Sequence, residues 1–400
     1  MRKELIVYSV ITSIKSWLVI FGSFICFFPG SSSPASATTC PDNSSLQQKV
    51  EAFDQYFTEL NHWLLSVYDV KTGGFWESIE EKEKLFEWPL FWVERRPRLE
   101  STARAVNIMY AMDTLQGLSP EVRQKIITYI QGFQNKEGWF DDPLEKRSRK
   151  SRLGRGLVYG VSSLKKLGGE PIYPVPTQNA NDNSADLSHL RDSSSLRRWF
   201  KAVTLEKQAW QAGSVIQDQY VLIDALPSVK RQELFSELFS LFEANQYPDG
   251  YWWEGKPYDR LSGSYKISTY YKKLRRPMPK ASHIFHSTLR VMKSQSVDNA
   301  SVIRNAITFL NTVLPQLQGK ITFREKCDAV ELTIKNSVFL KRTDGGFAQR
   351  PSDPWSATDG VSHAIKARRQ LRLFVGLDPK PLAGSINLNE LLQSALDSAR

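Results

Sequence analysis

One kind of turn recurs four times along the chain, and this repeat restricts the folds that are open to it. Each copy has one or two glycines followed by an aromatic residue, and a glycine in the left-handed conformation ends a helix. The intervals of 64, 112 and 95 residues between Gly74, Gly138, Gly250 and Gly345 hold one or two helix hairpins each. The repeat therefore predicts a ring or solenoid of helix pairs. The four copies are Thr72–Trp76, Gln134–Phe140, Asn245–Trp253 and Thr343–Phe347.

Apolar residues at helical spacing predict about twelve helices, and few segments show the two-residue alternation of strands. Ser119 followed by Pro120 is typical of a helix start, and Asp298 is expected to cap another helix. The hydrophobic content of 41% and charged content of 24% are ordinary for a soluble globular protein. The predicted helices span 46–68, 99–116, 119–135, 152–167, 193–204, 206–225, 228–245, 280–295, 298–315, 325–341, 358–374 and 387–399.

The N-terminus has the pattern of an export signal. Arg2 and Lys3 precede the apolar run Trp17–Phe28, and Ala35–Ala37 has the small-x-small form of a cleavage site. We expect a signal peptide at 1–37, a flexible arm at 38–45 and a single domain at 46–400, with 171–192 as a surface loop insert. The mature protein would then be periplasmic or secreted. The alternative is an uncleaved membrane anchor, which would be the one membrane contact of the chain; Lys15 argues against it.

Two cysteines, Cys40 and Cys327, remain after the expected cleavage. In an oxidising compartment they could pair and tie the arm to the body of the protein. Lipidation of Cys40 is the alternative, although Thr38 and Thr39 before it match a lipoprotein signal poorly. So few cysteines make a thiolate zinc site unexpected.

The fourth turn carries a family resemblance. Its sequence Asp344–Pro351, followed by Asp353 and Asp359–Gly360, resembles the Gln-Trp type repeats of terpenoid cyclases and protein prenyltransferase β-subunits. The segment Arg152–Pro174 also resembles uncharacterised bacterial toroid proteins. The resemblance covers most of residues 46–375, and it implies an all-α fold, an α/α toroid of about six helix hairpins, in which an inner ring of helices lines a central cavity.

The chain departs from the catalytic motifs of these families. Class II terpenoid cyclases protonate their substrate with an Asp-x-Asp-Asp motif, which does not occur in this sequence. Prenyltransferases hold zinc with an Asp-x-Cys pair and a distant His, but Cys327 lacks that spacing and Pro354–Ala357 contains no His. We therefore expect no metal and no other cofactor, and we do not carry over either chemistry.

In a toroid, the helix after each turn starts near the cavity mouth and runs down the inside, so its first two turns supply the site candidates. His283 and His286 share a helix face, either as a catalytic base with its partner, as metal ligands completed by His363 or Asp359, or as core histidines. Tyr270 could donate a proton to a leaving oxygen or be part of an aromatic wall. The candidate substrate-binding residues are Glu100, Arg104, Arg155, Trp210, Lys266, Asp359 and His363.

Each of the binding candidates also has a structural interpretation. Arg104 and Arg155 could bind carboxylates or sulfates through their planar guanidinium groups, or form buried ion pairs with Glu100 or Asp359. Tryptophans of the turns could stack on sugars or shape an apolar pocket, or merely close the turns. These tryptophans are Trp76, Trp139, Trp252 and Trp253.

The net charge of +11 favours an anionic partner, and export argues against nucleic acid. The leading interpretation is a monomeric, carbohydrate-active lyase or hydrolase that acts on an acidic glycan or small molecule in the cavity. In its elimination form, His283 or His286 is the base, Tyr270 the acid, and Arg104 or Arg155 neutralises the carboxylate. The alternatives are an isoprenoid-binding or cyclase-like toroid protein, or a non-catalytic envelope binding module.

Overall fold

The computed structural model describes residues 40, 42–83, 95–146, 149–176, 187–379, 382 and 387–399. All of them belong to one compact unit, Cys40–Arg400. The expected signal peptide 1–37 lies outside the described residues, as does part of the arm and the middle of the 171–192 loop. Of the helices in these ranges, none combines the length and the apolar character needed to cross a membrane.

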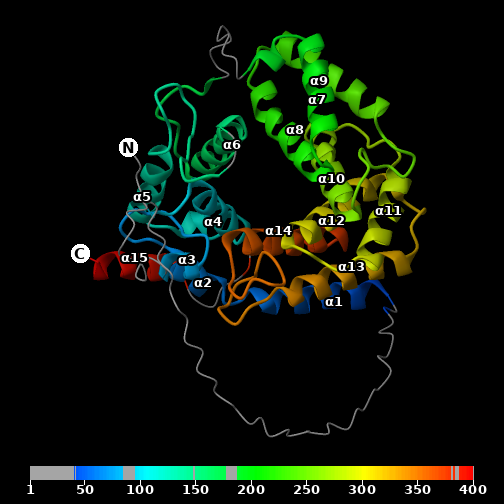
Figure 1. The fold of residues 1–400 in the computed structure, drawn as a ribbon. Coiled ribbons are helices and arrows are strands. Elements are labelled where there is room, and N and C mark those ends of the chain that lie inside the picture. Colours follow the sequence, from blue (N-terminus) through cyan, green and yellow to red (C-terminus); the bar gives the residue numbers. More distant parts are fainter. Residues whose placement is uncertain are drawn as a thin grey trace, which may run out of the picture. The chain divides into compact units, whose positions relative to one another are not determined.

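The described helices form two concentric layers (Figure 1). Six of them contact one another in sequence around a closed inner ring, in which the last helix, α14, packs back against the first, α4. Closure of this ring confirms the predicted α/α toroid. The ring consists of α4 (Leu99–Ala111), α6 (Arg149–Leu167), α8 (Ala209–Asp224), α10 (Pro257–Lys273), α12 (Ala300–Val313) and α14 (Thr358–Phe374).

A second set of helices alternates with the inner ones along the chain and covers them from outside (Figure 1). Six of the outer helices each lead into the next inner one, which gives six hairpins within the described residues, as predicted. A short helix, α3 (Ile79–Glu83), lies between the first pair. The outer layer consists of α1 (Asn43–Phe53), α2 (Leu60–Val67), α5 (Pro120–Gln131), α7 (Ser193–Glu206), α9 (Ser228–Ala244), α11 (Ala281–Ser294), α13 (Phe323–Phe339) and α15 (Leu388–Ser398).

Two helices are absent from the sequence prediction, the short helix α3 and the inner helix α10. Eleven of the seventeen residues of α10 are buried, and many of them are small or hydroxylated. Because α10 packs between α8 and α12 and under the outer layer, it has no one-sided apolar stripe, which is the signal that periodicity detects. The start of α12 was also misplaced by one residue, since Asn299 and not Asp298 caps it by accepting from Val302 N–H.

The four repeated turns have the same backbone geometry. In each, a glycine has a positive φ of 84° to 91°, and one backbone hydrogen bond closes a small loop in front of the buried aromatic residue. These glycines are Gly73, Gly138, Gly250 and Gly345. The closing bonds run from Asp69 N–H to Gly74 O, Asn135 N–H to Trp139 O, Tyr247 N–H to Tyr251 O and Arg342 N–H to Gly346 O.

Small residues at the start of the inner helices allow these turns to sit directly on them. A Cβ atom at Gly156 would lie 2.1 Å from Phe140 O, and one at Gly360 would lie 2.3 Å from Phe347 O. At the third turn, Ser264 accepts a hydrogen bond from Trp252 N–H. The turns therefore help to fix the positions of the four inner helices that follow them, α4, α6, α10 and α14.

Cys40 and Cys327 are both free thiols, and their pairing stays a prediction. Burial raises the pKa of Cys327 to about 12, with Cys40 beside it as a further cause. Cys40 Sγ also lies 3.4 Å from Glu331 Oε1 and from Lys49 Nζ.

The closest approach between inner helices gives a first prediction. A Cβ at Gly263 of α10 would lie 2.3 Å from Ala209 O of α8, so we expect Gly263→Ala to cost about 1–3 kcal/mol of unfolding free energy by overpacking. Gly154 of α6 has no neighbouring atom within 4 Å of such a Cβ. Gly154→Ala is therefore the matched control, which should be neutral or stabilising by about 0.5–1 kcal/mol. Urea denaturation checks both, and equal effects would contradict the close approach.

Candidate functional site

A network of charged side chains occupies one end of the ring interior. Its centre is Arg104 of α4, which forms ion pairs with Glu100 on its own helix, with Asp359 Oδ1 of α14 at 2.9 Å and with Glu77 Oε1 at 3.3 Å. Arg155 of α6 donates to both carboxylate oxygens of Glu100, at 2.8 Å from Nε. The network therefore joins three of the inner helices.

The network continues along α14 toward α12. His363 Nε2 lies 2.9 Å from Asp359 Oδ1, one helical turn earlier on the same face. Arg304 of α12 lies with its Nε 3.3 Å from His363 Nδ1, and its guanidinium also donates to the hydroxyl of Tyr265. Arg304 is therefore neutralised by no carboxylate in the described ranges.

Sequence reasoning missed Glu77, which follows the aromatic residue of the first turn. Its carboxylate accepts from the Thr358 hydroxyl at 2.6 Å and from Asp359 N–H at 3.1 Å. Glu77 therefore satisfies the first backbone donor groups of α14 and anchors that helix to the first turn. Two of the other three turns carry an acid at the equivalent position, Asp142 and Glu254, and Asp142 Oδ2 likewise accepts from the first backbone N–H of an inner helix, that of Leu99, at 2.9 Å. This recurrence is a sequence signal from which the role of Glu77 could have been predicted.

The three carboxylates of the network, Glu77, Glu100 and Asp359, differ in pKa. Burial raises the pKa of Glu77 to about 7, although Arg104 opposes this. Burial would also raise the pKa of Glu100, but Arg104 and Arg155 outweigh it and hold that pKa at about 2. In the same way Arg104 and His363 hold the pKa of Asp359 well below its usual range. Glu100 and Asp359 are therefore ionised at neutral pH.

This arrangement does not suit proton donation to an alkene. A proton donor needs a protonated oxygen that faces the substrate, and Glu100 and Asp359 hold no proton near neutral pH. Glu77 has the raised pKa, but its oxygens already accept hydrogen bonds from Thr358, Asp359 and Arg104. The network therefore acts as an ionic lining that joins helices and positions charges.

The ring interior is accessible to water. The side chains of Glu77, Arg104, Asp359 and His363 lie deep inside the ring, yet keep exposed fractions of 28, 12, 20 and 12%. A packed apolar core would leave such groups without solvent, at a high desolvation cost. These charged groups therefore keep contact with solvent, which lowers the cost of placing them inside the ring.

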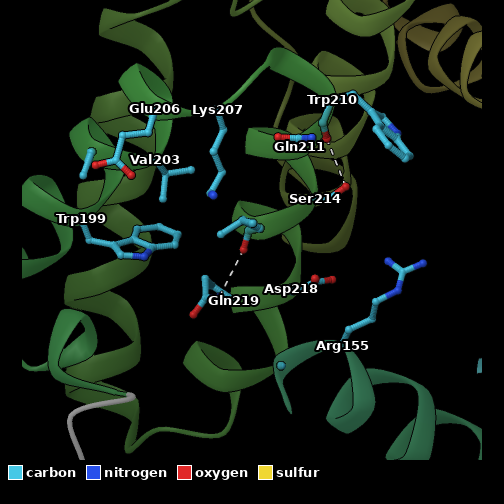
Figure 2. Close-up of a pocket in the computed structure, with 13 residues that line it drawn as sticks. Arg155, Trp199, Val203, Glu206, Lys207, Trp210, Gln211, Ser214, Asp218 and Gln219 are labelled. Carbon is cyan, nitrogen blue, oxygen red and sulfur yellow. Dashed lines mark hydrogen bonds between the residues drawn. The ribbon is translucent and has the colours of Figure 1, made fainter. Parts of the chain in front are cut away.

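A pocket of about 490 Å³ adjoins the network where α6 and α8 separate (Figure 2). This volume is in the range typical of small-molecule sites. One wall is apolar, with Trp199 and Val203 of α7 opposite Val215 of α8. Trp199 is held in place by stacking on His189, whose ring nitrogen lies 2.6 Å from Gln219 Oε1.

Polar groups enter this pocket from both ends. Arg155 belongs to its lining and to the charged network, so it joins the two. Lys207, at the end of α7, extends into the space between Trp199 and α8 (Figure 2), and it forms no ion pair with a residue that the structure describes. The pocket therefore combines an aromatic wall with an available ammonium group.

The predicted binding residues separate into two groups. The structure brings Glu100, Arg104, Arg155, Asp359 and His363 together in the ring interior. The others lie elsewhere. Trp210 is 42% exposed and lines the pocket, with Lys266 Nζ 4.7 Å from its ring centroid. Trp76, Trp252 and Trp253 are buried beneath their turns, and Trp252 donates to Phe242 O.

The structure does not bring the predicted catalytic residues together. His283 is exposed on the outer helix α11, and His286 of the same helix pairs with Glu325 of α13 at 3.1 Å. Tyr270 is on the inner helix α10 but fully buried, and its hydroxyl donates to Ile216 O at 2.6 Å. The physical reason is the missed helix α10, since it takes the inner position that we had assigned to α11.

The alternative of a metal bound by His283, His286 and His363 has no geometric support either. Among the described residues, no group of three His, Cys, Asp or Glu side chains has a geometry that could hold a metal ion. Two of these histidines instead pair with a single carboxylate each, His363 with Asp359 and His286 with Glu325.

No protein-family model matches this chain, and no curated protein is significantly similar to it in sequence. Among solved structures, it is similar to variants of the type II terpene cyclase MstE from Scytonema. One, in complex with the product merosterolic acid A, has 11% identity and a TM-score of 0.46. Another, in complex with the substrate geranylgeranyl dihydroxybenzoate, has 12% identity and a TM-score of 0.44. Each alignment covers 83% of this chain and 99% of the other.

The interpretation as a carbohydrate-active lyase or hydrolase of an acidic glycan is wrong. The structure places the residues on which elimination depended apart from one another, since His283 and His286 lie on the outer helix α11 and Tyr270 is buried on α10. His283 and His286 were expected at the central cavity, but the outer helix α11 carries both of them.

The charged network predicts a strong effect of neutralising Glu100. In Glu100→Gln, Arg155 loses its bidentate ion pair and Arg104 loses one of three, and we expect the unfolding free energy to fall by about 3 kcal/mol. Glu233→Gln, which breaks a pair with Lys230 between two side chains that are 39 and 29% exposed, is the matched control and should have little effect. Similar losses in both variants, measured by urea denaturation, would contradict a buried network.

His363 predicts a pH dependence of stability. Burial holds its pKa at about 4, against about 6.5 in an unfolded chain. As the pH falls from 6.5 to 4, the unfolded chain takes up this proton first, so the folded protein loses up to about 3 kcal/mol of stability. We expect His363→Gln to lose less over the same interval in urea titrations. Parallel pH profiles of the two proteins would show that His363 titrates normally.

Proposed function

We propose that this protein binds a small amphiphilic molecule of the isoprenoid class, with an apolar prenyl chain and an acidic head, in the pocket between α6, α7 and α8. The observation that carries the proposal is the combination in one pocket of an apolar wall, formed by Trp199, Val203 and Val215, with the unpaired ammonium group of Lys207. Apolar walls with a few placed polar groups are characteristic of small-molecule sites.

The dimensions of the pocket favour a short chain. Its α8 wall runs from Trp210 to Gln219, which is about 14 Å at the rise of an α-helix. The flat face of Trp199 suits a branched polyene, which presents a broad apolar surface over a short length. An extended long-chain fatty acid would protrude from a pocket of this length.

The acidic head follows from the charges. Lys207 and Arg155 are the cations of the lining, against Glu206 and Asp218, and Arg155 is already paired with Glu100. Lys207 is therefore the group that is free to pair with a carboxylate of the ligand, at a site where the aromatic wall excludes part of the water and strengthens the interaction. Binding, rather than proton-initiated cyclisation, fits the ionised state of Glu100 and Asp359.

Titration with all-trans-farnesoic acid, followed by tryptophan fluorescence and calorimetry, tests the proposal. We expect saturable binding that Val203→Trp abolishes by filling the pocket. Lys207→Met should weaken binding of the acid roughly tenfold, the effect of losing one charge-assisted contact, while binding of the alcohol farnesol stays unchanged. Lys201→Met, an exposed site on the same helix, is the control and should leave both unchanged.

Two results would contradict the proposal. Equal affinity of the Val203→Trp variant would place the ligand elsewhere. Tighter binding of palmitic acid than of farnesoic acid would show that the pocket does not select a prenyl chain.

A further inference from the structure

Three cations lie on the inner faces of the ring, deeper than the carboxylates of the charged network. They are Lys166 of α6, Arg304 of α12 and Lys366 of α14. Lys166 donates to Asn107 and, at 2.9 Å, to Ser162, and Arg304 donates to Tyr265 and contacts His363. Lys366 has no hydrogen-bond partner within the described part of the chain.

The register of the inner helices places these groups at a similar depth. On α12 and α14, Arg304 contacts His363 and Asn311 contacts Gln370, each pair 59 residues apart. The two helices therefore run side by side in the same direction, and Lys366 lies between these two contacts. The same offset joins Tyr159 to Glu100 and Lys166 to Asn107 on α6 and α4.

Among the residues that the structure describes, no carboxylate pairs with these three cations. Arg104 and Arg155 are already paired with Glu77, Glu100 and Asp359. Burial lowers the pKa of Lys366 to about 7, and the cations Arg304, Lys166 and Arg104 act in the same direction. Asp359, on the same helix, opposes this shift, and it is itself paired with His363.

The surroundings allow an ion to reach this place. The polar partners Asn107, Ser162, Asn311 and Gln370 are all partly exposed, and the network above them is wetted, as its exposed fractions show. Amide and hydroxyl groups can also donate to an oxyanion.

We propose that the ring interior binds a dianionic oxyanion of the phosphate or sulfate type between Lys166, Arg304 and Lys366. The guanidinium of Arg304 matches two oxygens of such an ion, and the two ammonium groups supply point charges on either side. A dianion, unlike chloride or acetate, neutralises most of the charge of these three cations. The site involves other residues and another ligand than the pocket of the proposed function, so either can fail alone.

Calorimetric titration of the whole protein with sodium sulfate and sodium phosphate, in a chloride buffer of constant ionic strength, tests the site. We expect saturable binding of one ion, weakened roughly tenfold or more in Lys366→Met through the loss of one charge-assisted contact and partly restored in Lys366→Arg. The control Lys335→Met changes an exposed lysine of the outer helix α13 and should bind normally.

The pH profile supplies a second, independent readout. Sulfate does not titrate between pH 6 and 8, whereas Lys366 does, so sulfate affinity should fall by up to about tenfold over this interval in the wild type and stay flat in Lys366→Met. Phosphate binding without sulfate binding would restrict the site to phosphate. Absence of binding of both ions, or unchanged affinity in Lys366→Met, would overturn the proposal.

Discussion

The left-handed glycine turn is the constraint on which this architecture depends. At Gly73, Gly138, Gly250 and Gly345 the chain leaves an outer helix, closes a small hydrogen-bonded loop and enters an inner helix directly beneath a buried aromatic residue. A side chain with a Cβ adopts this conformation only at a cost. Small residues of the inner helices, such as Gly156 and Gly360, let the backbone of the turn pack directly against the helix. The turn therefore fixes the direction and the position of the inner helix that follows it.

That placement has an electrostatic consequence. The parallel inner helices bring charged positions from different repeats to one depth, so Glu100, Arg104, Arg155 and Asp359 meet across the ring. Mutual pairing offsets the cost of removing these charges from bulk water, and water inside the ring reduces that cost further. At Lys166, Arg304 and Lys366 the positive charge is paired with no carboxylate in the described part of the chain. Where α6 and α8 separate, Arg155 also borders an apolar pocket.

Much of the fold could be predicted from the sequence, because glycine turns and one-sided apolar stripes are local signals. The site could be predicted only in part. Glu100, Arg104, Asp359 and His363 follow repeated turns, which places them inside the ring. α10 lacks a stripe, since it is buried on several sides, and missing it moved His283 and His286 inward by one helix. Lys207 and the pocket depend on contacts between distant segments, for which the chain carries no local pattern, whereas the acid at Glu77 recurs at Asp142 and Glu254 of two other turns.

The pocket between α6, α7 and α8 is central to the proposed function, and Arg155 joins it to the charged network of the ring interior. A crystal structure of the protein with all-trans-farnesoic acid tests this function most directly. We predict that the prenyl chain lies against Trp199, Val203 and Val215, with the carboxylate in hydrogen-bond contact with Lys207. A ligand bound on the outer surface, or a pocket that is filled by its own side chains in the complex, would contradict it.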